Sequence, residues 1–172
     1  KIIKPSPDRI EPVCPVADKC GGCQLQHMRY AAQLAYKQRL VQDLMPNQEV
    51  RYPLGMEDPY AYRNKAQFPI QIKNNQVFMG FYRVHSNDIV PIQQCAIQDP
   101  VINELYAWFQ EHLTVSLAQG LRHLYIRYIQ STNQSQIVLI GQHKNDWEQL
   151  VKDCVSTFDH VASIVFNQNN RK

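Results

Sequence analysis

The chain has 172 residues with a formal net charge of +3, and 44% of them are hydrophobic while only 19% are charged. Much of its polarity comes from 20 Gln and 11 Asn, which are scattered between apolar positions and form no low-complexity tract. The length suffices for a domain with a buried core, and no apolar run approaches the roughly 20 residues of a membrane span. We therefore expect an ordered, soluble, cytoplasmic protein that has no membrane partner.

The ends of the sequence and its charge distribution bear on what the chain is. It begins with Lys1 and ends with a polar segment, 167–172, directly after an apolar stretch, so we expect a piece of a longer protein. The basic excess is confined to residues 1–95, which carry 12 basic and 8 acidic side chains, whereas residues 96–172 carry 6 and 7. A patch of this size can help to hold a polyanion but does not by itself indicate nucleic-acid binding.

The N-terminal third is predicted to contain a loop followed by one helix. Residues 1–27 contain four prolines and show no hydrophobic periodicity, which is typical of a loop. Apolar residues at helical spacing predict a helix over residues 28–45, and Pro46 ends it. We therefore expect a cysteine-rich loop over 1–27 and an α+β domain over 28–172.

A hairpin is predicted next. Apolar and polar residues alternate over residues 65–73, which is the pattern of a strand with one buried face. The pair Asn74-Asn75 supplies a tight turn that tolerates positive φ, and residues 76–83 form the returning strand. A short strand is expected around residues 89–92.

The remaining sequence predicts two helices that each begin at an Asp, and three strands. These are a helix after Asp99-Pro100, strands over 121–129 and 136–142, a helix after Asp146 whose apolar stripe includes Cys154 and Val155, and a strand over 161–166. From residue 76 onward the order is β-α-β-β-α-β, that of a split βαβ or ferredoxin-like unit. The expected fold class is α+β with a mainly antiparallel sheet.

Four of the five cysteines share a pattern that is typical of a metal site. Three lie in the N-terminal loop with C-x5-C-x2-C spacing, and the fourth follows after 71 intervening residues. The glycines between the second and third let the backbone fold tightly and leave N–H groups free to point at sulfur. The four candidate ligands are Cys14, Cys20, Cys23 and Cys95.

Four thiolates suit either tetrahedral zinc or an iron–sulfur cluster, and the spacing alone leaves both open. A disulfide framework is disfavoured because the chain is large and its cysteine count is odd. A thioredoxin-type redox pair is disfavoured because the Pro-rich loop offers no βαβ unit. His27, beside the ligand loop, is expected to donate a hydrogen bond to a ligand. Cys154 is expected to be a buried hydrophobe.

Candidate RNA contacts come from basic and aromatic side chains that interleave before and into the strand predicted over 65–73, and from the predicted strands over 76–83 and 121–129. Such residues can stack on unpaired bases and neutralise phosphates, although a plain solvated sheet face would carry the same types. On the strand over 121–129, alternate residues share one face. The candidates are Tyr62, Arg63, Lys65, Arg83, His123 and Arg127.

The cysteine motif is one of several separated motifs that occur in the same order in one family. Between about residues 12 and 130 the chain closely resembles the bacterial RNA uridine C5-methyltransferases, in particular the 23S rRNA (uracil-5-)-methyltransferases. The matching blocks are residues 14–27 around Cys20-Gly21-Gly22-Cys23, then 62–67, 79–83, 86–90, Cys95 and 120–127.

The resemblance implies a cofactor, a reaction and a substrate. Cys14, Cys20, Cys23 and Cys95 would ligate a 4Fe-4S cluster. The parent enzyme would transfer a methyl group from S-adenosylmethionine to C5 of a uridine in 23S rRNA rather than tRNA, using a catalytic Cys and a carboxylate base.

The chain departs from the family in what it lacks. It has no Gly-x-Gly loop and no Pro-Pro pair, and no cysteine remains to act as nucleophile. We therefore expect the N-terminal RNA-binding barrel and the C-terminal methyltransferase domain to lie elsewhere in the parent, and this piece to be inactive alone. The alternative is a zinc-stabilised protein-interaction module without RNA affinity.

Overall fold

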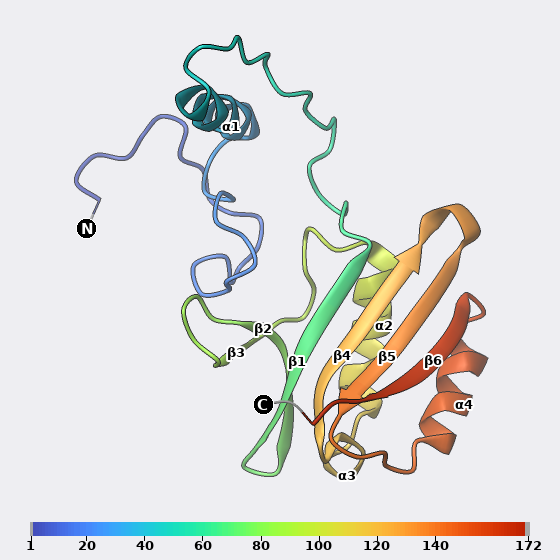
Figure 1. Cartoon of the computed structure of the whole chain (residues 1–172). Helices are drawn as coiled ribbons and strands as arrows, with labels where there is room; N and C mark the ends of the chain where they lie inside the picture. The colour runs from blue at the N-terminus through green and yellow to red at the C-terminus, as the bar shows by residue number, and fades with distance from the viewer. Residues whose placement is uncertain (1, 171–172) are drawn as a thin grey trace.

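The computed structural model describes residues 2–170 as a six-stranded mixed sheet with helices on one face (Figure 1). Lys1, Arg171 and Lys172 lie outside the described residues. In the described part of the chain, no helix has the length and apolar character needed to span a bilayer. The elements are α1 (Tyr30–Leu44), β1 (Lys65–Lys73), β2 (Gln76–Tyr82), β3 (Ile89–Pro91), α2 (Pro100–His112), α3 (Val115–Ala118), β4 (Leu121–Ile129), a 3-10 turn (Gln130–Thr132), β5 (Gln134–Gly141), α4 (Glu148–Thr157) and β6 (Val161–Gln168).

The sheet has the strand order β3-β2-β1-β4-β5-β6, and neighbours are antiparallel except for β5 and β6. The α+β class and the mainly antiparallel sheet are therefore confirmed. The ferredoxin-like arrangement is not confirmed. A split βαβ unit keeps another strand between its two parallel strands, whereas β5 and β6 are parallel direct neighbours joined through α4. The strand β1, which precedes the β-α-β-β-α-β series, lies between β2 and β4.

The predicted hairpin forms as expected. Asn74 and Asn75 have φ angles of 49° and 58°, the left-handed conformation that a two-residue hairpin turn requires and that Asn tolerates. Close pairing also explains Gly80 on β2, where an added Cβ would lie 2.0 Å from the carbonyl oxygen of Val90 on β3. The hairpin thus brings β3 and the loop that follows it to one edge of the sheet.

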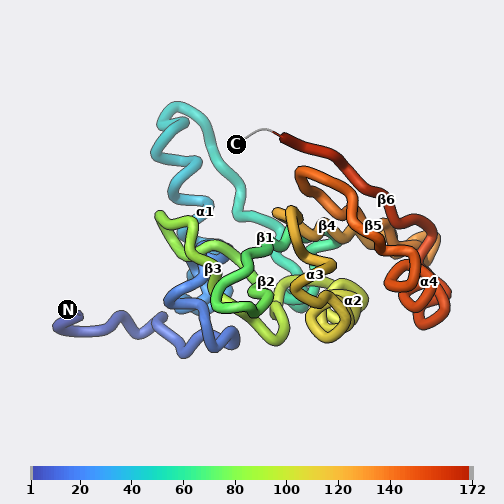
Figure 2. The backbone as a smooth tube through the Cα atoms, turned by 90° about the horizontal axis from the view of Figure 1, so that it is seen from below, coloured from blue at the N-terminus to red at the C-terminus, as the bar shows by residue number. Residues whose placement is uncertain are grey.

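The core lies between the sheet and the two helices α2 and α4, which cover the same face (Figures 1 and 2). The expected Asp99 cap is confirmed, because its side chain accepts a hydrogen bond from the backbone N–H of Val101 and Pro100 begins the helix. Four α2 side chains are at most 1% exposed. They are Ile102, Leu105, Tyr106 and Phe109.

The last helix differs from the prediction in two details. Its N-cap residue is Trp147, although the Asp146 carboxylate accepts a hydrogen bond from the backbone N–H of Glu148, 3.2 Å away. Val155 is 47% exposed, because it lies at the margin of the stripe, whereas Cys154 is fully buried as expected.

The N-terminal part, with α1, lies beside the β2–β3 edge of the sheet (Figures 1 and 2). The predicted helix is confirmed, but none of its side chains is fully buried, and Leu44 is 84% exposed. The helix α1 therefore adds no buried side chain to the main core, whereas Val16 of the cysteine loop packs against that core.

Candidate metal centre and adjoining basic surfaces

The four cysteines of the motif line one small cavity at the β2–β3 edge of the sheet. Three come from the N-terminal loop and Cys95 comes from the segment between β3 and α2. The rest of the lining is mostly apolar, and it holds one cation, Arg63, but no carboxylate and no imidazole. All five cysteines are free thiols. The structure thus brings together four sulfur donors that are distant in sequence.

The cysteine loop is attached to the end of β2 by backbone hydrogen bonds. The Gly21 N–H donates to the Tyr82 carbonyl at 2.9 Å, and the Val84 N–H donates to the Lys19 carbonyl at 3.3 Å. Gly21 suits this close contact, since an added Cβ would lie 3.1 Å from the Tyr82 oxygen and the neighbouring backbone would have to shift by a few tenths of an ångström. The backbones of Cys20 and Arg83 therefore form an isolated antiparallel β-bridge. This places Arg83, a predicted RNA contact, beside the cavity.

Cys95 is held from the other side by Asn103 in the first turns of α2. The Cys95 N–H donates to Asn103 Oδ1 at 2.8 Å, and Asn103 Nδ2 donates to the Cys95 carbonyl at 3.1 Å. Sequence reasoning missed Asn103, because a polar residue near a helix start gives no signal that distinguishes it from a solvated one.

Two N–H groups donate to cysteine sulfur within the loop. The Gly22 N–H lies 3.4 Å from Cys20 Sγ, and Gln26 Nε2 lies 3.3 Å from Cys23 Sγ. Gln26 also accepts from the Cys14 N–H at 3.3 Å, so one side chain links two of the four cysteines. The hydrogen bond that was predicted for His27 is thus made by Gln26. N–H donors of this kind stabilise negative charge on sulfur.

The thiols influence one another electrostatically. Burial raises the pKa of Cys20, the Gly22 hydrogen bond opposes this, and neighbouring Cys23 and Cys14 raise the pKa further. Burial likewise raises the pKa of Cys95, hydrogen bonds from the backbone N–H groups of Ile97 and Gln98 oppose this, and Cys23 and Cys14 raise the pKa further. Four thiolates this close require a cation to offset their charge. Cys154, in contrast, is isolated in the core, where burial raises its pKa to about 11.

The donor set fits a thiolate-bound metal centre, but its geometry is not that of a closed single-ion site. No group of three or more His, Cys, Asp or Glu side chains that could hold a metal ion occurs in residues 2–170. The donor chemistry, sulfur alone with N–H groups donating to it, fits soft metal ligation. What the structure shows is therefore four thiol side chains around one small cavity.

A row of basic and polar side chains lies on the open face of the sheet, opposite α2 and α4. The register places Lys65 directly across from Arg127, and Gln67 across from Tyr125. The intervening Leu124 and Ile126 are fully buried on the helix-covered face. The prediction that alternate residues of this strand, His123 and Arg127 among them, share one face is therefore confirmed. The strand β1 adds Lys65 as a second exposed cation on that face.

His123 belongs to this row but contributes little charge. Burial lowers its pKa and Arg122 lowers it further, so the imidazole is neutral at pH 7. Its Nε2 lies 3.4 Å from the Tyr82 hydroxyl, and the two rings meet edge to face. His123 thus adds a polar aromatic side chain to the row but no positive charge.

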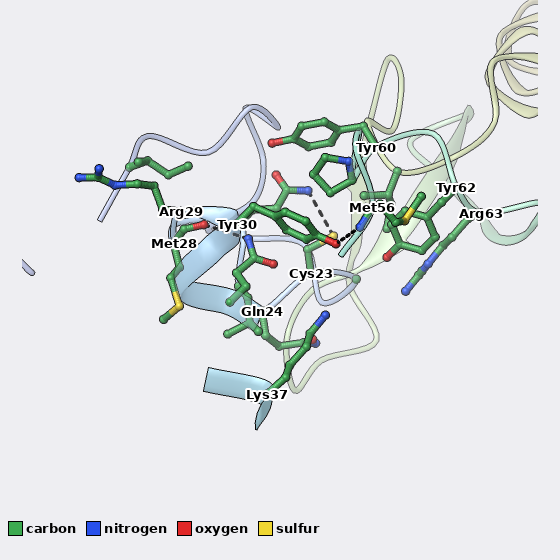
Figure 3. Close-up of a pocket in the computed structure, with 17 residues that line it drawn as sticks. Cys23, Gln24, Met28, Arg29, Tyr30, Lys37, Met56, Tyr60, Tyr62 and Arg63 are labelled. Carbon is green, nitrogen blue, oxygen red and sulfur yellow. Dashed lines mark hydrogen bonds between the residues drawn. The ribbon is translucent and has the colours of Figure 1, made fainter. Parts of the chain in front are cut away.

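Tyr62 and Arg63 line a second, larger cavity of about 550 Å³, away from the sheet row (Figure 3). Its walls are the cysteine loop, the start of α1 and the segment over 56–63. The 61–63 segment is held by the chain after Cys95, with the Arg63 N–H donating to the Ile97 carbonyl at 2.8 Å. Tyr62 and Arg63 therefore lie on a different surface from Lys65, His123 and Arg127, and Arg83 lies beside the cysteine cavity.

No protein-family model matches the chain, but curated relatives and solved structures do. A protein of Clostridium tetani named "Uncharacterized RNA methyltransferase" is 39% identical over 99% of this chain. Relatives named in the same way from Halalkalibacterium halodurans and Staphylococcus epidermidis are each 37% identical over 99% of it. Each match covers 41% of the relative. The chain thus spans about two-fifths of the length of these curated relatives.

The solved structure is the crystal structure of Pyrococcus abyssi tRNA (uracil-54, C5)-methyltransferase in complex with S-adenosyl-L-homocysteine. It matches with a TM-score of 0.71 and 20% identity, over 100% of this chain and 40% of that chain. At this identity the likeness shows the fold alone. The relatives are thus named RNA methyltransferases, and the fold occurs in a uracil-C5 enzyme.

Proposed function

We propose that this chain is the cluster-bearing, RNA-contacting part of an S-adenosylmethionine-dependent RNA uridine C5-methyltransferase. The observation that carries the proposal is the convergence of Cys14, Cys20, Cys23 and Cys95 on one cavity, in a chain whose relatives are named RNA methyltransferases. Methyl transfer, with its catalytic residues and S-adenosylmethionine site, belongs to the longer parent. This piece alone is inactive.

The metal group of the proposal is a 4Fe-4S cluster held by the four cysteines. An all-sulfur donor set supports iron–sulfur or zinc chemistry, and Arg63 together with the N–H donors at sulfur offsets the negative charge of a tetrathiolate centre. When bound, the cluster supplies a cross-link between the N-terminal loop and the chain after β3. Site assembly is then coupled to folding of the loop.

The substrate of the parent is a uridine in 23S rRNA, in line with the motifs that the sequence shares with that group. A tRNA substrate is the alternative, in line with the reaction named for the Pyrococcus abyssi enzyme. Either RNA would meet the basic row on the sheet, where Lys65 and Arg127 lie side by side. Two adjacent exposed cations are suited to phosphate.

Anaerobic purification of the chain tests the metal assignment. A brown protein with broad near-visible absorbance and about four iron atoms per chain is expected for a 4Fe-4S cluster on four thiolates. A colourless protein with one zinc would refute the cluster and favour the zinc-stabilised interaction module. Cys154→Ser is the matched control, because it removes a thiol that lies in the core away from the cavity.

RNA affinity is tested separately, by titrating a fluorescent single-stranded RNA at several salt concentrations. Replacing both Lys65 and Arg127 by Ala should weaken binding and reduce the salt slope by roughly 0.7 for each phosphate that these cations neutralise. Lys152→Ala is a suitable control, since this exposed lysine on α4 is paired with Glu148 at 2.6 Å. No binding by the unmodified chain would refute the RNA part of the proposal.

A further inference from the structure

The larger cavity has the composition of a nucleotide site, although the proposed function does not assign it. With a volume of about 550 Å³ it falls within the usual range for small-ligand pockets. Its lining contains three cations, three tyrosines and no acidic side chain. These are Arg29, Lys37 and Arg63, with Tyr30, Tyr60 and Tyr62.

The charge of the cavity favours an anionic ligand. Arg29 is engaged by Asp8, 3.9 Å away, and by the Pro7 carbonyl. Among residues 2–170, neither Lys37 nor Arg63 forms an ion pair with a carboxylate. The first turn of α1, which borders the cavity, contains no acidic residue and has no side-chain cap. Lys37 and Arg63 are therefore the two cations of this cavity without a carboxylate partner in the described part of the chain, and Arg63 also faces the cysteine cavity.

The uncharged lining favours a planar, hydrogen-bonding group beside that anion. Tyr62 is 52% exposed and Tyr60 is half-buried, so both rings have a face or edge open toward the space that they line (Figure 3). Tyr30 already accepts a hydrogen bond from the Met56 N–H at 2.9 Å, which fixes its ring across the cavity. Gln33 uses its Nε2 on the Met28 carbonyl, and its amide oxygen remains to accept from a ligand.

We propose that this cavity binds one unstacked nucleotide of single-stranded RNA, with the base against the tyrosines and its phosphates at Lys37 and Arg63. Base stacking on aromatic side chains next to a cationic track is the general mode of single-strand recognition. The proposal rests on the proposed function, because it presupposes that the chain binds RNA. It adds a second contact, separate from the basic row on the sheet.

A matched pair of lysine and arginine variants tests the phosphate contact. Lys37 and Arg39 are both exposed cations on α1, two residues apart, but only Lys37 lines the cavity. With a fluorescein-labelled 12-nucleotide oligouridine as probe, Lys37→Ala should weaken binding and reduce the salt slope by roughly 0.7. Arg39→Ala should leave both unchanged. Equal effects of the two variants would overturn the site.

Two further measurements test the base contact. Tyr60→Ala should weaken binding about tenfold, within the range for losing one base–aromatic stack, while Tyr60→Phe should retain it. A probe with one 4-thiouridine should crosslink, on irradiation, to the tyrosines of the cavity, as mapped by mass spectrometry. An abasic oligonucleotide that binds as tightly as oligouridine would overturn base recognition.

The outcomes separate this inference from the proposed function. If the unmodified chain binds no RNA, the proposed function fails. If the chain binds RNA and replacing Lys65 and Arg127 weakens binding, but Lys37→Ala matches Arg39→Ala and no crosslink falls in the cavity, only the nucleotide site is wrong. The visible absorbance of each variant is measured as well, so that loss of the metal centre is not mistaken for loss of the site.

Discussion

Replacing Asn103 with Ala tests whether α2 holds Cys95 in position. The two hydrogen bonds between the Asn103 side chain and the Cys95 backbone, at 2.8 and 3.1 Å, each contribute about 1 kcal/mol net. Together their loss should lower the free energy of opening this segment by roughly 2 kcal/mol, which corresponds to about 30-fold faster hydrogen exchange. Amide exchange at Cys95, followed by NMR on the metal-free chain, measures this directly.

Two other variants make the measurement specific. Asn103→Asp keeps an acceptor for the Cys95 N–H but loses the donor to its carbonyl, so it should give an intermediate rate. Glu104→Ala, at the next and exposed position of the same helix, should leave the Cys95 amide unchanged. If Cys95 exchanges at the same rate in the Ala variant and the unmodified chain, Asn103 does not position the ligand, and the reasoning from these distances is refuted.

Three further predictions concern residues away from the Asn103 contact. Cys154, whose pKa burial raises to about 11, should stay protonated at pH 8 and resist iodoacetamide until the chain unfolds. Tyr106→Phe should lower the free energy of unfolding by about 1–2 kcal/mol in urea titrations, because the buried hydroxyl donates to two backbone carbonyls. His123→Gln should leave the salt slope of RNA binding unchanged at pH 7, whereas Arg127→Ala should reduce it, because only Arg127 is charged.

Local signals predicted most elements but not the order of the strands. The Asn74-Asn75 turn and the Asp99 cap act through neighbouring backbone, so their effects can be read from a few residues. The pairing of β1 with β4, in contrast, is a long-range contact. It places Lys65 opposite Arg127, which lies more than fifty residues further along the chain. A β-α-β-β-α-β series does not state which strands are neighbours, so the ferredoxin-like order could not be decided from it.

The residues of the candidate site also differ in whether the sequence could predict them. The cysteine spacing predicted four candidate ligands, and the fold places all four on the lining of one cavity. Gln26 and Asn103 were missed because each acts through hydrogen bonds to backbone or sulfur that only the fold creates. Residues that orient a ligand have no residue type of their own, so their role becomes visible only with the geometry.

The cysteine cavity and the larger cavity, which we propose to bind a nucleotide and call the nucleotide cavity, share a wall. Five residues line both: Gly22, Cys23, Gln26, Arg63 and Ile97. Most of this wall belongs to a loop with little core of its own, so its conformation depends on whether the four sulfurs are tied together.

We therefore expect Cys95→Ser, which removes one ligand from the far side of the wall, to lose the metal centre and also to weaken oligouridine binding at the nucleotide cavity. Cys154→Ser should do neither. The comparison is sharpest when each variant is tested again with Lys37→Ala. If the wall transmits the effect, Lys37→Ala will weaken binding further in the Cys154→Ser chain but hardly at all in the Cys95→Ser chain, because the cavity is already disrupted there. Equal losses in both backgrounds would mean that the two cavities act independently.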